Sequence, residues 1–342
     1  MIRVLVVDDS AVVRALIRDV LERDPDIRVV AEADNGATAV ELAQTAQPTL
    51  ITMDVTMPVM DGLDATAEIM AKRPTPILVF SASLDRTETD LSFQAVQRGA
   101  LDVMLKPAAD SAADFQAIGQ ALVNRVKLLA RIRVIPHPRG RQRKTRSIAR
   151  ERLPARQRVV LIGASLGGPN TVLHLLQGLP PNFPAPMLLV QHIAAGFTEG
   201  LARWLDRESP FTARVAVQGD TPVAGTVLVA PAGRHLALKG GLAVLHDGEP
   251  LQGCRPAVDE LFASAARDRG ADCIAVLLTG MGQDGADGIA AVKRARGLTI
   301  AQDQASSVVW GMPRAAIERG VIDKVLPLAG IAPELVAIVA PA

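Results

Sequence analysis

Short apolar runs alternate with amphipathic stretches along most of this 342-residue chain, and this alternation restricts its possible folds more than any other feature. In the first block the strand-like runs are Ile2–Val7, Ile27–Ala31, Leu50–Met53, Ile77–Phe80 and Leu101–Leu105. The amphipathic stretches between them are Ala11–Leu21, Thr38–Ala46, Leu63–Ala71, Glu88–Arg98 and Phe115–Leu129. Such alternation builds βαβ units around a parallel sheet with helices on both faces. We therefore predict a flavodoxin-like doubly wound domain over residues 1–130.

The alternation returns over residues 158–342. The strand-like runs are Val159–Ile162, Met187–Val190, Val227–Ala230, Ile274–Leu278 and Leu298–Ala301. The helix-like stretches are Asn170–Gln177, Thr198–Asp206, Val258–Arg267 and Gly285–Arg294. Leu236–Leu238 and Leu242–Leu245 flank Gly240-Gly241, a spacing typical of an antiparallel hairpin. This pattern predicts a second doubly wound α/β domain, Rossmann-like, with a β-hairpin insert.

The segment between the two blocks is basic and contains prolines. Eleven Arg or Lys side chains lie between positions 131 and 158, and Glu151 is the only acid among them. We predict an interdomain linker over residues 131–157. A tether to an acidic partner or to nucleic acid is the alternative, but no helix-turn-helix or zinc pattern accompanies the charge, so a solvated spacer is favoured.

Composition excludes several classes of protein. The net charge is +1, with no Tyr and two Trp, which argues against a nucleic-acid-binding surface. No apolar run reaches the roughly 18 residues of a membrane span. The N-terminus reaches acid at Asp8 without a cleavage site, which argues against a secretory signal. Cys254 and Cys273 form neither a disulfide framework nor a metal-ligand spacing, and we expect a cytoplasmic protein.

Charged and hydroxyl side chains follow the strand-like runs of the first block. Asp8 and Asp9 follow the first run, Asp54 the third, Ser81 the fourth, and Lys106 ends the fifth. Because ligands of open parallel sheets bind at the carboxyl ends of the strands, we expect these groups to lie together. Oxygen ligands suit Mg²⁺, which would join the carboxylates. Asp54 is then the expected nucleophile toward a phosphoryl donor, with Lys106 offsetting the developing charge and Ser81 bonding a phosphoryl oxygen.

Each of these residues taken singly has a simpler interpretation, such as helix capping by Asp9 or Ser10. The set is more specific: Asp-Asp at 8–9, Asp-x-x-Met-Pro-x-Met-Asp-Gly at 54–62, Ser-Ala at 81–82 and Lys-Pro at 106–107. With these motifs, residues 1–125 resemble a response-regulator receiver domain. The resemblance implies phosphorylation of Asp54.

The same resemblance implies a Mg²⁺ site. Asp9, Asp54 and the Thr56 carbonyl would bind the ion directly, and Asp8 would act through water. Two positions depart from the family pattern, because Val103 stands where an aromatic switch residue is frequent and Ser81 where many members have threonine. An aromatic switch is therefore not expected, whereas the acceptor chemistry is.

A strand-to-helix turn with the pattern G-x-S-x-G places Ser165 after the first apolar run of the second block. Among the five histidines, His192 follows the next apolar strand, so it should project at the same sheet edge as Ser165. Asp284 follows Ile274–Leu278 in a glycine-rich loop at a third strand end, and Asp287 is its rival. These positions predict a Ser-His-Asp hydrolytic site in which His192 is the base and Asp284 orients it.

The residues of this region also allow other interpretations. A glycine-rich turn can simply cradle a phosphate, and Asp284 could cap the helix that follows it. A dinucleotide site is disfavoured because Ser165 replaces a required glycine and because Gln191 and His192 stand where an acidic ribose ligand belongs. The order Ser…His…Asp also differs from that of ordinary α/β-hydrolases.

Five motifs of the second block share a second resemblance. They are Gly-Ala-Ser-Leu-Gly-Gly-Pro (163–169), Gln-His (191–192), Arg-Pro-Ala-Val-Asp (255–259), Thr-Gly-Met-Gly-Gln-Asp-Gly-Ala (279–286) and Gly-Met-Pro (311–313). Together they resemble the catalytic domain of the chemotaxis protein-glutamate methylesterases, the CheB family. The resemblance implies the triad Ser165, His192 and Asp284, with an oxyanion site at the backbone of Met281 and of Leu166, where the family usually has threonine.

The family implies hydrolysis of glutamyl methyl esters on chemoreceptors and deamidation of certain receptor glutamines, with no cofactor in the catalytic domain. It further implies that a chemotaxis histidine kinase phosphorylates the receiver, and that the unphosphorylated receiver covers the Ser165 cleft. We thus predict a phosphorylation-activated serine hydrolase acting in sensory adaptation. The alternatives are a receiver-controlled, non-catalytic binding module and a transcription regulator that uses the basic linker.

Overall fold

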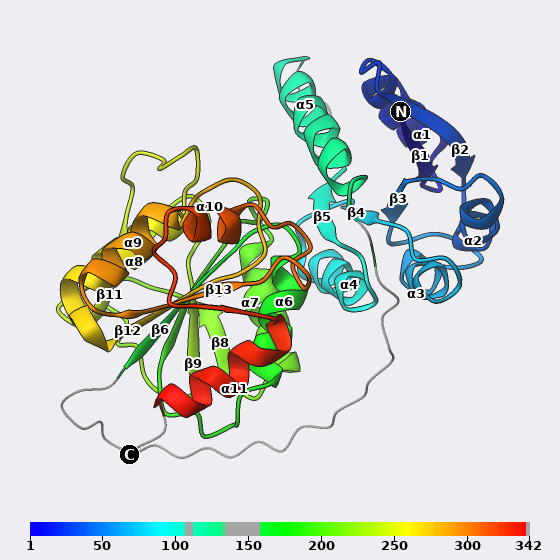
Figure 1. Ribbon diagram of the computed structural model, residues 1–342. Coiled ribbons are helices and arrows are strands. Elements are labelled where there is room, and N and C mark those ends of the chain that lie inside the picture. The colour runs from blue at the N-terminus through cyan, green and yellow to red at the C-terminus, as the bar shows by residue number, and fades with distance from the viewer. Residues whose placement is uncertain (107–111, 133, 135–157, 340–342) are drawn as a thin grey trace. The chain divides into compact units, whose positions relative to one another are not determined.

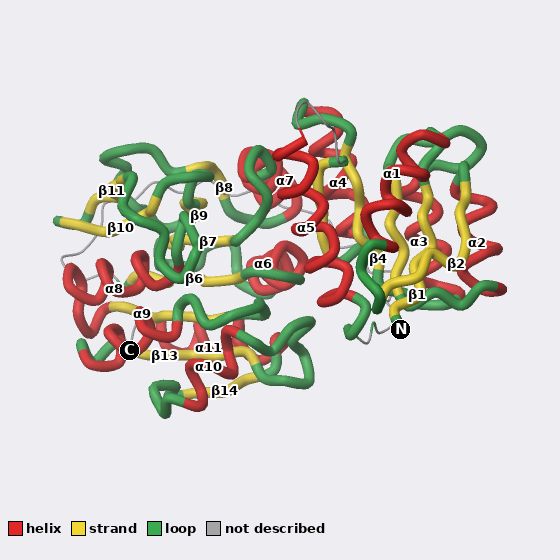
Figure 2. The backbone as a smooth tube through the Cα atoms, turned by 90° about the horizontal axis from the view of Figure 1, so that it is seen from above, coloured by secondary structure: helices red, strands yellow, loops and turns green. Residues whose placement is uncertain are grey.

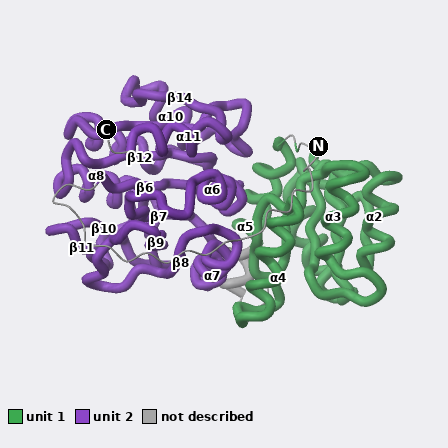
Figure 3. Tube along the Cα trace, turned by 90° about the horizontal axis from the view of Figure 1, so that it is seen from below, with its two compact units in different colours: residues 1–141 green, residues 142–342 purple. Residues whose placement is uncertain are grey.

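The computed structural model describes residues 1–106, 112–132, 134 and 158–339. The chain divides into two compact units, residues 1–141 and 142–342, shown in different colours in Figure 3. The division falls inside the segment predicted as a linker, although most of that segment, with His137, lies outside the described residues. None of the helices in the described ranges is both long and apolar enough to cross a lipid bilayer.

The first unit is a parallel α/β domain. Its elements in chain order are β1 (Ile2–Val7), α1 (Ala11–Glu22), β2 (Ile27–Ala33), α2 (Gly36–Thr45), β3 (Leu50–Asp54), α3 (Gly62–Lys72), β4 (Ile77–Ser81), α4 (Arg86–Gln97), β5 (Asp102–Leu105) and α5 (Ala112–Leu129). The sheet order is β2-β1-β3-β4-β5 and every pairing is parallel. Helices lie on both sides of the strands (Figure 2), so the predicted flavodoxin-like order is confirmed.

Local sequence explains where these helices begin. Ser10, Asn35, Asp61 and Asp85 each precede a helix, and each side-chain oxygen accepts a hydrogen bond from the backbone N–H three residues on. Such caps satisfy donors that the first helical turn leaves free. The sequence alternative that Ser10 caps the first helix is therefore confirmed, and Asp9 is left for another role.

The second unit contains a seven-stranded sheet and a separate hairpin. Its elements are β6 (Val159–Ala164), α6 (Gly168–Gln177), β7 (Met187–Gln191), α7 (Thr198–Glu208), β8 (Thr212–Val215), β9 (Thr226–Val229), β10 (His235–Lys239), β11 (Leu242–His246), α8 (Val258–Arg269), a 3-10 turn (Gly270–Asp272), β12 (Cys273–Leu277), α9 (Ala286–Arg294), β13 (Leu298–Gln302), α10 (Met312–Glu318), β14 (Lys324–Leu326) and α11 (Leu328–Val339). The sheet order is β14-β13-β12-β6-β7-β9-β8, all parallel, and β10 pairs with β11 antiparallel as predicted.

The strand order of this sheet reverses direction beside β6. From β6 the chain builds β7, β8 and β9 on one side and later returns to build β12, β13 and β14 on the other. The carboxyl ends of β6 and β12 therefore flank a topological switch point, the usual place for a ligand in an open parallel sheet.

Sequence patterns did not predict the peripheral elements β8, β14, α10 and α11. Strand β14 has only three residues, none of them buried, and α11 contains Pro333, which is unusual inside a helix. Short edge elements carry little periodicity, so they form where the finished sheet gives them a surface.

Candidate active site

Ser165 lies in the turn between β6 and α6. Its backbone N–H donates to the Thr279 carbonyl at 3.0 Å, and its carbonyl accepts from Gly168 at 2.8 Å. Gly167 has φ +72°, the left-handed conformation that favours glycine. A Cβ on Gly280 would lie 2.8 Å from the Ser165 Cβ, so a glycine is required beside the serine. Ser165 is 9% exposed at the sheet edge.

His192 lies immediately beyond the end of the adjacent strand. Ala164 and Gln191 are partners in the register of β6 and β7, and the His192 N–H donates to the Ala164 carbonyl at 2.9 Å. The Gln191 side-chain amide donates to the carbonyls of Ser165 at 2.6 Å and His192 at 2.9 Å. Ser165 and His192 are therefore neighbours on adjacent strands, and Gln191 fixes the backbone of both.

Asp284 contacts the imidazole from the loop after β12. Its Oδ2 lies 2.8 Å from His192 Nε2 and accepts from the Val258 N–H at 2.8 Å, while Oδ1 accepts from the Asp259 N–H at 2.9 Å. Burial alone would raise the pKa of Asp284, but these hydrogen bonds lower it below its usual value. The carboxylate thus occupies the N-terminus of α8, where free N–H groups favour negative charge.

Capping by Asp284 therefore occurs, but on α8 and not on the helix that follows it. The N-cap of α9 is Gly285, which makes no side-chain cap, and Asp259 instead accepts from the Gly288 N–H at 2.7 Å. The rival Asp287 is exposed and pairs with Arg319. Of the two carboxylates considered from sequence, Asp284 is the one in contact with His192.

The contact with Asp284 determines which imidazole nitrogen is available. A carboxylate accepts from Nε2–H, so in the neutral form of the ring the lone pair is on Nδ1. Cys254 Sγ lies 4.0 Å from Nδ1. Burial lowers the pKa of His192, but hydrogen bonds with Asp284 and Cys254 outweigh burial and raise it to about 9. Across the described residues, no hydrogen bond joins the Ser165 hydroxyl to His192; catalytic hydrogen bonds are often long before substrate binds.

The loop after β12 is hydrogen-bonded to the turn that carries Ser165. The Thr279 hydroxyl donates to the Leu166 carbonyl at 3.0 Å, and the Thr279 N–H donates to Gln302 Oε1 at 2.8 Å. Leu166 is buried beside Ser165, whereas Met281 is 58% exposed at the rim. Buried polar contacts thus bind this loop to the serine turn.

The three other described histidines lie on α6 and in the hairpin. His174 is exposed on α6. His235 is buried in the hairpin, where its ring stacks on His246 with centroids 5.1 Å apart and accepts from the Ala257 N–H. Both hairpin histidines therefore have structural partners.

Sequence reasoning missed Cys254, Gln191 and Gln302 as parts of this site. Gln191 directly precedes His192, and this position in the motif was the one available signal for it. Cys254 is 62 residues from His192, and no spacing rule connects them. Gln302 belongs to β13, which reaches the loop after β12 only because the two strands are neighbours.

The first unit holds an acidic cluster at the carboxyl edge of its own sheet. Lys106 Nζ lies 2.8 Å from Asp8 Oδ2 and 2.8 Å from Asp54 Oδ2. Carboxylate oxygens of Asp8, Asp9 and Asp54 lie within 4.8 Å of one another. Ser81 is buried and donates to the Ser83 carbonyl at 2.7 Å. The structure thus groups the acidic residues as expected from sequence.

The charges of this cluster fit a divalent cation. One ammonium group faces three carboxylates, and two of these, Asp8 and Asp54, are buried. Burial raises the pKa of Asp54 to about 6, although Lys106 opposes the change. An all-oxygen donor set that retains excess negative charge suits Mg²⁺.

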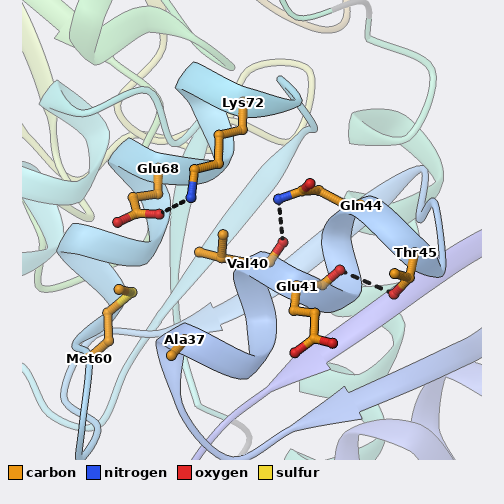
Figure 4. A pocket seen from close by; sticks show the side chains of 8 residues that line it. All are labelled: Ala37, Val40, Glu41, Gln44, Thr45, Met60, Glu68 and Lys72. Atoms are coloured by element: carbon orange, nitrogen blue, oxygen red, sulfur yellow. Dashed lines mark hydrogen bonds and ion pairs between the residues drawn. The ribbon is translucent and has the colours of Figure 1, made fainter.

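A separate pocket of about 310 Å³ lies between α2 and α3 (Figure 4). Its wall includes Val40 and Met60, with Glu68 and Lys72 ion-paired at 2.6 Å along its rim. The pocket contains none of the acidic cluster residues, so it is not a part of that site.

Two family models match the chain. The model described as CheB methylesterase matches residues 160–335, and the model described as response regulator receiver domain matches residues 4–114. A solved structure, the CheB methylesterase catalytic domain of Thermotoga maritima, is 41% identical with a TM-score of 0.52, covering 54% of this chain and 99% of that one.

Curated relatives match nearly the full length. One is "Protein-glutamate methylesterase/protein-glutamine glutaminase 2" of Anaeromyxobacter dehalogenans (strain 2CP-C), 50% identical, covering 96% of this chain and 94% of the relative. Another, "Protein-glutamate methylesterase/protein-glutamine glutaminase" of Nitrosospira multiformis, is 41% identical, covering 99% and 98%. The chain therefore belongs to the CheB methylesterase family, in the form that carries a response regulator receiver domain before the methylesterase domain.

Proposed function

We propose that this chain is a phosphorylation-activated serine hydrolase that demethylates glutamyl methyl esters on chemoreceptors and deamidates certain receptor glutamines. The observation that supports it best is the contact between His192 and Asp284 at the strand edge that also carries Ser165. The names of the full-length relatives agree with both activities. In this proposal residues 1–130 are the receiver, 131–157 the linker, and 158–342 the catalytic domain.

In the proposed mechanism Ser165 is the nucleophile. His192 Nδ1 accepts the Ser165 proton as Oγ attacks the ester carbonyl, and the imidazolium then protonates the departing methoxide, which leaves as methanol. Water hydrolyses the acyl-enzyme with His192 again acting as base, which releases the glutamate side chain. On a glutamine substrate the same steps release ammonia.

Asp284 and the loop after β12 support these steps. The carboxylate holds the imidazole in the tautomer with a free Nδ1 and stabilises the imidazolium that forms. Backbone N–H groups of Met281 and Leu166 are proposed to donate to the oxyanion. Removing one such donor raises the barrier by about 3–4 kcal/mol in comparable enzymes.

The receiver part of the proposal rests on the acidic cluster. The Asp54 carboxylate attacks the phosphorus of a phosphohistidine on a chemotaxis histidine kinase; the new O–P bond forms as the N–P bond breaks and the imidazole of the kinase leaves. Lys106 contacts the carboxylate of Asp54 and stabilises charge on the incoming group. Mg²⁺, held by Asp8, Asp9 and Asp54, would neutralise phosphoryl oxygens when bound. Ser81 would donate to a phosphoryl oxygen only in the phosphorylated state, which biases the receiver toward its active form.

Regulation requires that phosphorylation favour an active arrangement. Moving the protein from almost entirely inactive to almost entirely active needs about 5 kcal/mol of differential stabilisation. A few charge-assisted hydrogen bonds to a new phosphoryl group, each of about 1.5–3 kcal/mol, supply that range.

Methanol release from methylated receptor tests the proposal. We expect Ser165→Ala to release no methanol while still taking up phosphate from a small phosphodonor, and Asp54→Asn to keep basal activity without stimulation. Undiminished methanol release by Ser165→Ala would refute the assignment of the nucleophile. Labelling of Ser165 by a serine-reactive phosphonate separates a hydrolase from a non-catalytic binding module.

A further inference from the structure

Cys254 is held beside the imidazole of His192 by a tight turn. Leu251 and Cys254 exchange two backbone hydrogen bonds, at 2.8 and 3.1 Å. The two residues between them, Gln252 and Gly253, have φ of +51° and +78°, as the central residues of a type I′ turn do. The Gln252 amide also donates to Asp259 Oδ2 at 2.9 Å. The turn is thus held closed at its base and fixed at Gln252, and Cys254 Sγ lies 4.0 Å from Nδ1 and 3.9 Å from the Gln252 carbonyl.

The three donor atoms at this position form a compact group. One ligand atom each of His192, Cys254 and Asp284 lies within 4.8 Å of the others. Zinc bond lengths of about 2.3 Å to sulfur and about 2.0 Å to nitrogen, at a tetrahedral angle, place the two ligand atoms roughly 3.5 Å apart. The observed 4.0 Å between Cys254 Sγ and His192 Nδ1 exceeds that spacing by about half an ångström, which a small rotation of the Cys254 side chain can close.

Asp284 prepares the imidazole for a metal. Because the carboxylate accepts a hydrogen bond from Nε2–H, the lone pair of the neutral imidazole is on Nδ1, and Cys254 lies on that side of the ring. A carboxylate on one nitrogen and a metal on the other is the arrangement by which proteins orient histidine ligands. His192 is partly exposed and Cys254 is also accessible, so an ion and its water ligands can reach the pair.

We propose that Cys254 and His192 form a Zn²⁺ site, supported by Asp284, whose occupancy switches off the hydrolase. The proposal rests on the proposed function, because the metal takes the same Nδ1 lone pair that accepts the Ser165 proton. A thiolate and an imidazole select Zn²⁺ over Mg²⁺. The acidic cluster of the receiver has only oxygen donors and the opposite preference, so the two metals act at different sites of one chain.

Metal binding is measured directly with Co²⁺ as a probe. We expect the full-length wild type with Co²⁺ to show a thiolate-to-cobalt charge-transfer absorption, displaced by Zn²⁺, and Cys254→Ser to lack it. Cys273→Ser is the matched control, because Cys273 is buried and its thiol donates to the Ala265 carbonyl. Absence of the band in wild type, or its loss in Cys273→Ser, would overturn the proposal.

Inhibition is measured as methanol release, each variant being compared with its own rate in excess chelator. We expect Zn²⁺ to inhibit wild type and Cys273→Ser reversibly, Cys254→Ser to need at least about tenfold more Zn²⁺, and Mg²⁺ not to inhibit. Equal sensitivity of Cys254→Ser and wild type would contradict the proposal. Ser165→Ala is titrated with Co²⁺ in parallel: it should retain the band, so the metal site is tested even if the assigned nucleophile is wrong.

Discussion

Replacing Asp284 by asparagine tests how the base is positioned. The carboxylate of Asp284 accepts from His192 Nε2 and from two N–H groups of the first turn of α8. Asparagine keeps the shape and one acceptor oxygen, but its NH₂ group cannot accept the third hydrogen bond. Either the imidazole turns to the wrong tautomer or a backbone N–H of α8 loses its partner.

The cost to catalysis and the cost to stability differ in size. In a serine protease the equivalent change lowers kcat about 10⁴-fold, since the base is held in the wrong tautomer, which corresponds to roughly 5.5 kcal/mol of barrier. The folded state loses a charge at the N-terminus of α8, worth about 0.5–2 kcal/mol, and one hydrogen bond to a charged group, worth about 1.5–3 kcal/mol. We therefore expect Asp284→Asn to fold with a lowered Tm and to lose nearly all activity.

The assay is methanol release under saturating phosphodonor, with thermal unfolding of the same preparation. Asp287→Asn is the matched control. Asp287 is exposed on α9, and its ion pair is with Arg319, away from His192 in the contacts of the described residues. If Asp284→Asn kept a kcat within about tenfold of wild type while folded, the assignment of Asp284 as the residue that positions His192 would be wrong.

Three further predictions concern other parts of the two sites. Because the pKa of His192 is raised to about 9 and the base must be neutral, kcat/KM should increase with pH up to that value; a rate profile that is flat below pH 9 would contradict this. The folding stability that the raised pKa contributes should be lost as pH rises through about 9. Gly280→Ala should lower kcat more than tenfold, because the new Cβ would lie 2.8 Å from the Ser165 Cβ. Urea unfolding should show a destabilisation of about 1–3 kcal/mol, and an unchanged kcat would exclude close packing of Gly280 against Ser165. Lys106→Ala should leave Asp8 and Asp54 without their paired ammonium group and destabilise the receiver by about 3–5 kcal/mol at neutral pH. Unfolding measured with and without Mg²⁺ should show that the ion restores part of this stability; no effect of Mg²⁺ would argue against the cation site.

Much of the site could be predicted because of a property of parallel sheets. All carboxyl ends of the strands meet at one edge, so a residue that directly follows a strand is placed by the strand alone. This holds for Asp54, the last residue of β3, and for Ser165, which directly follows β6; the apolar runs predict both strands. The register of Ala164 with Gln191 then brings His192 beside the serine.

What the sequence alone determined is therefore the two doubly wound domains and the strand ends that carry the reactive groups, because both follow from local periodicity and chain direction. The tertiary structure alone decided that Asp284 caps α8 and not α9, that it faces Nε2 of His192, and that Cys254 lies at Nδ1. These contacts join residues 26 to 92 positions apart. No periodicity connects such residues; they meet only after the helices have packed on the sheet and fixed where each loop ends.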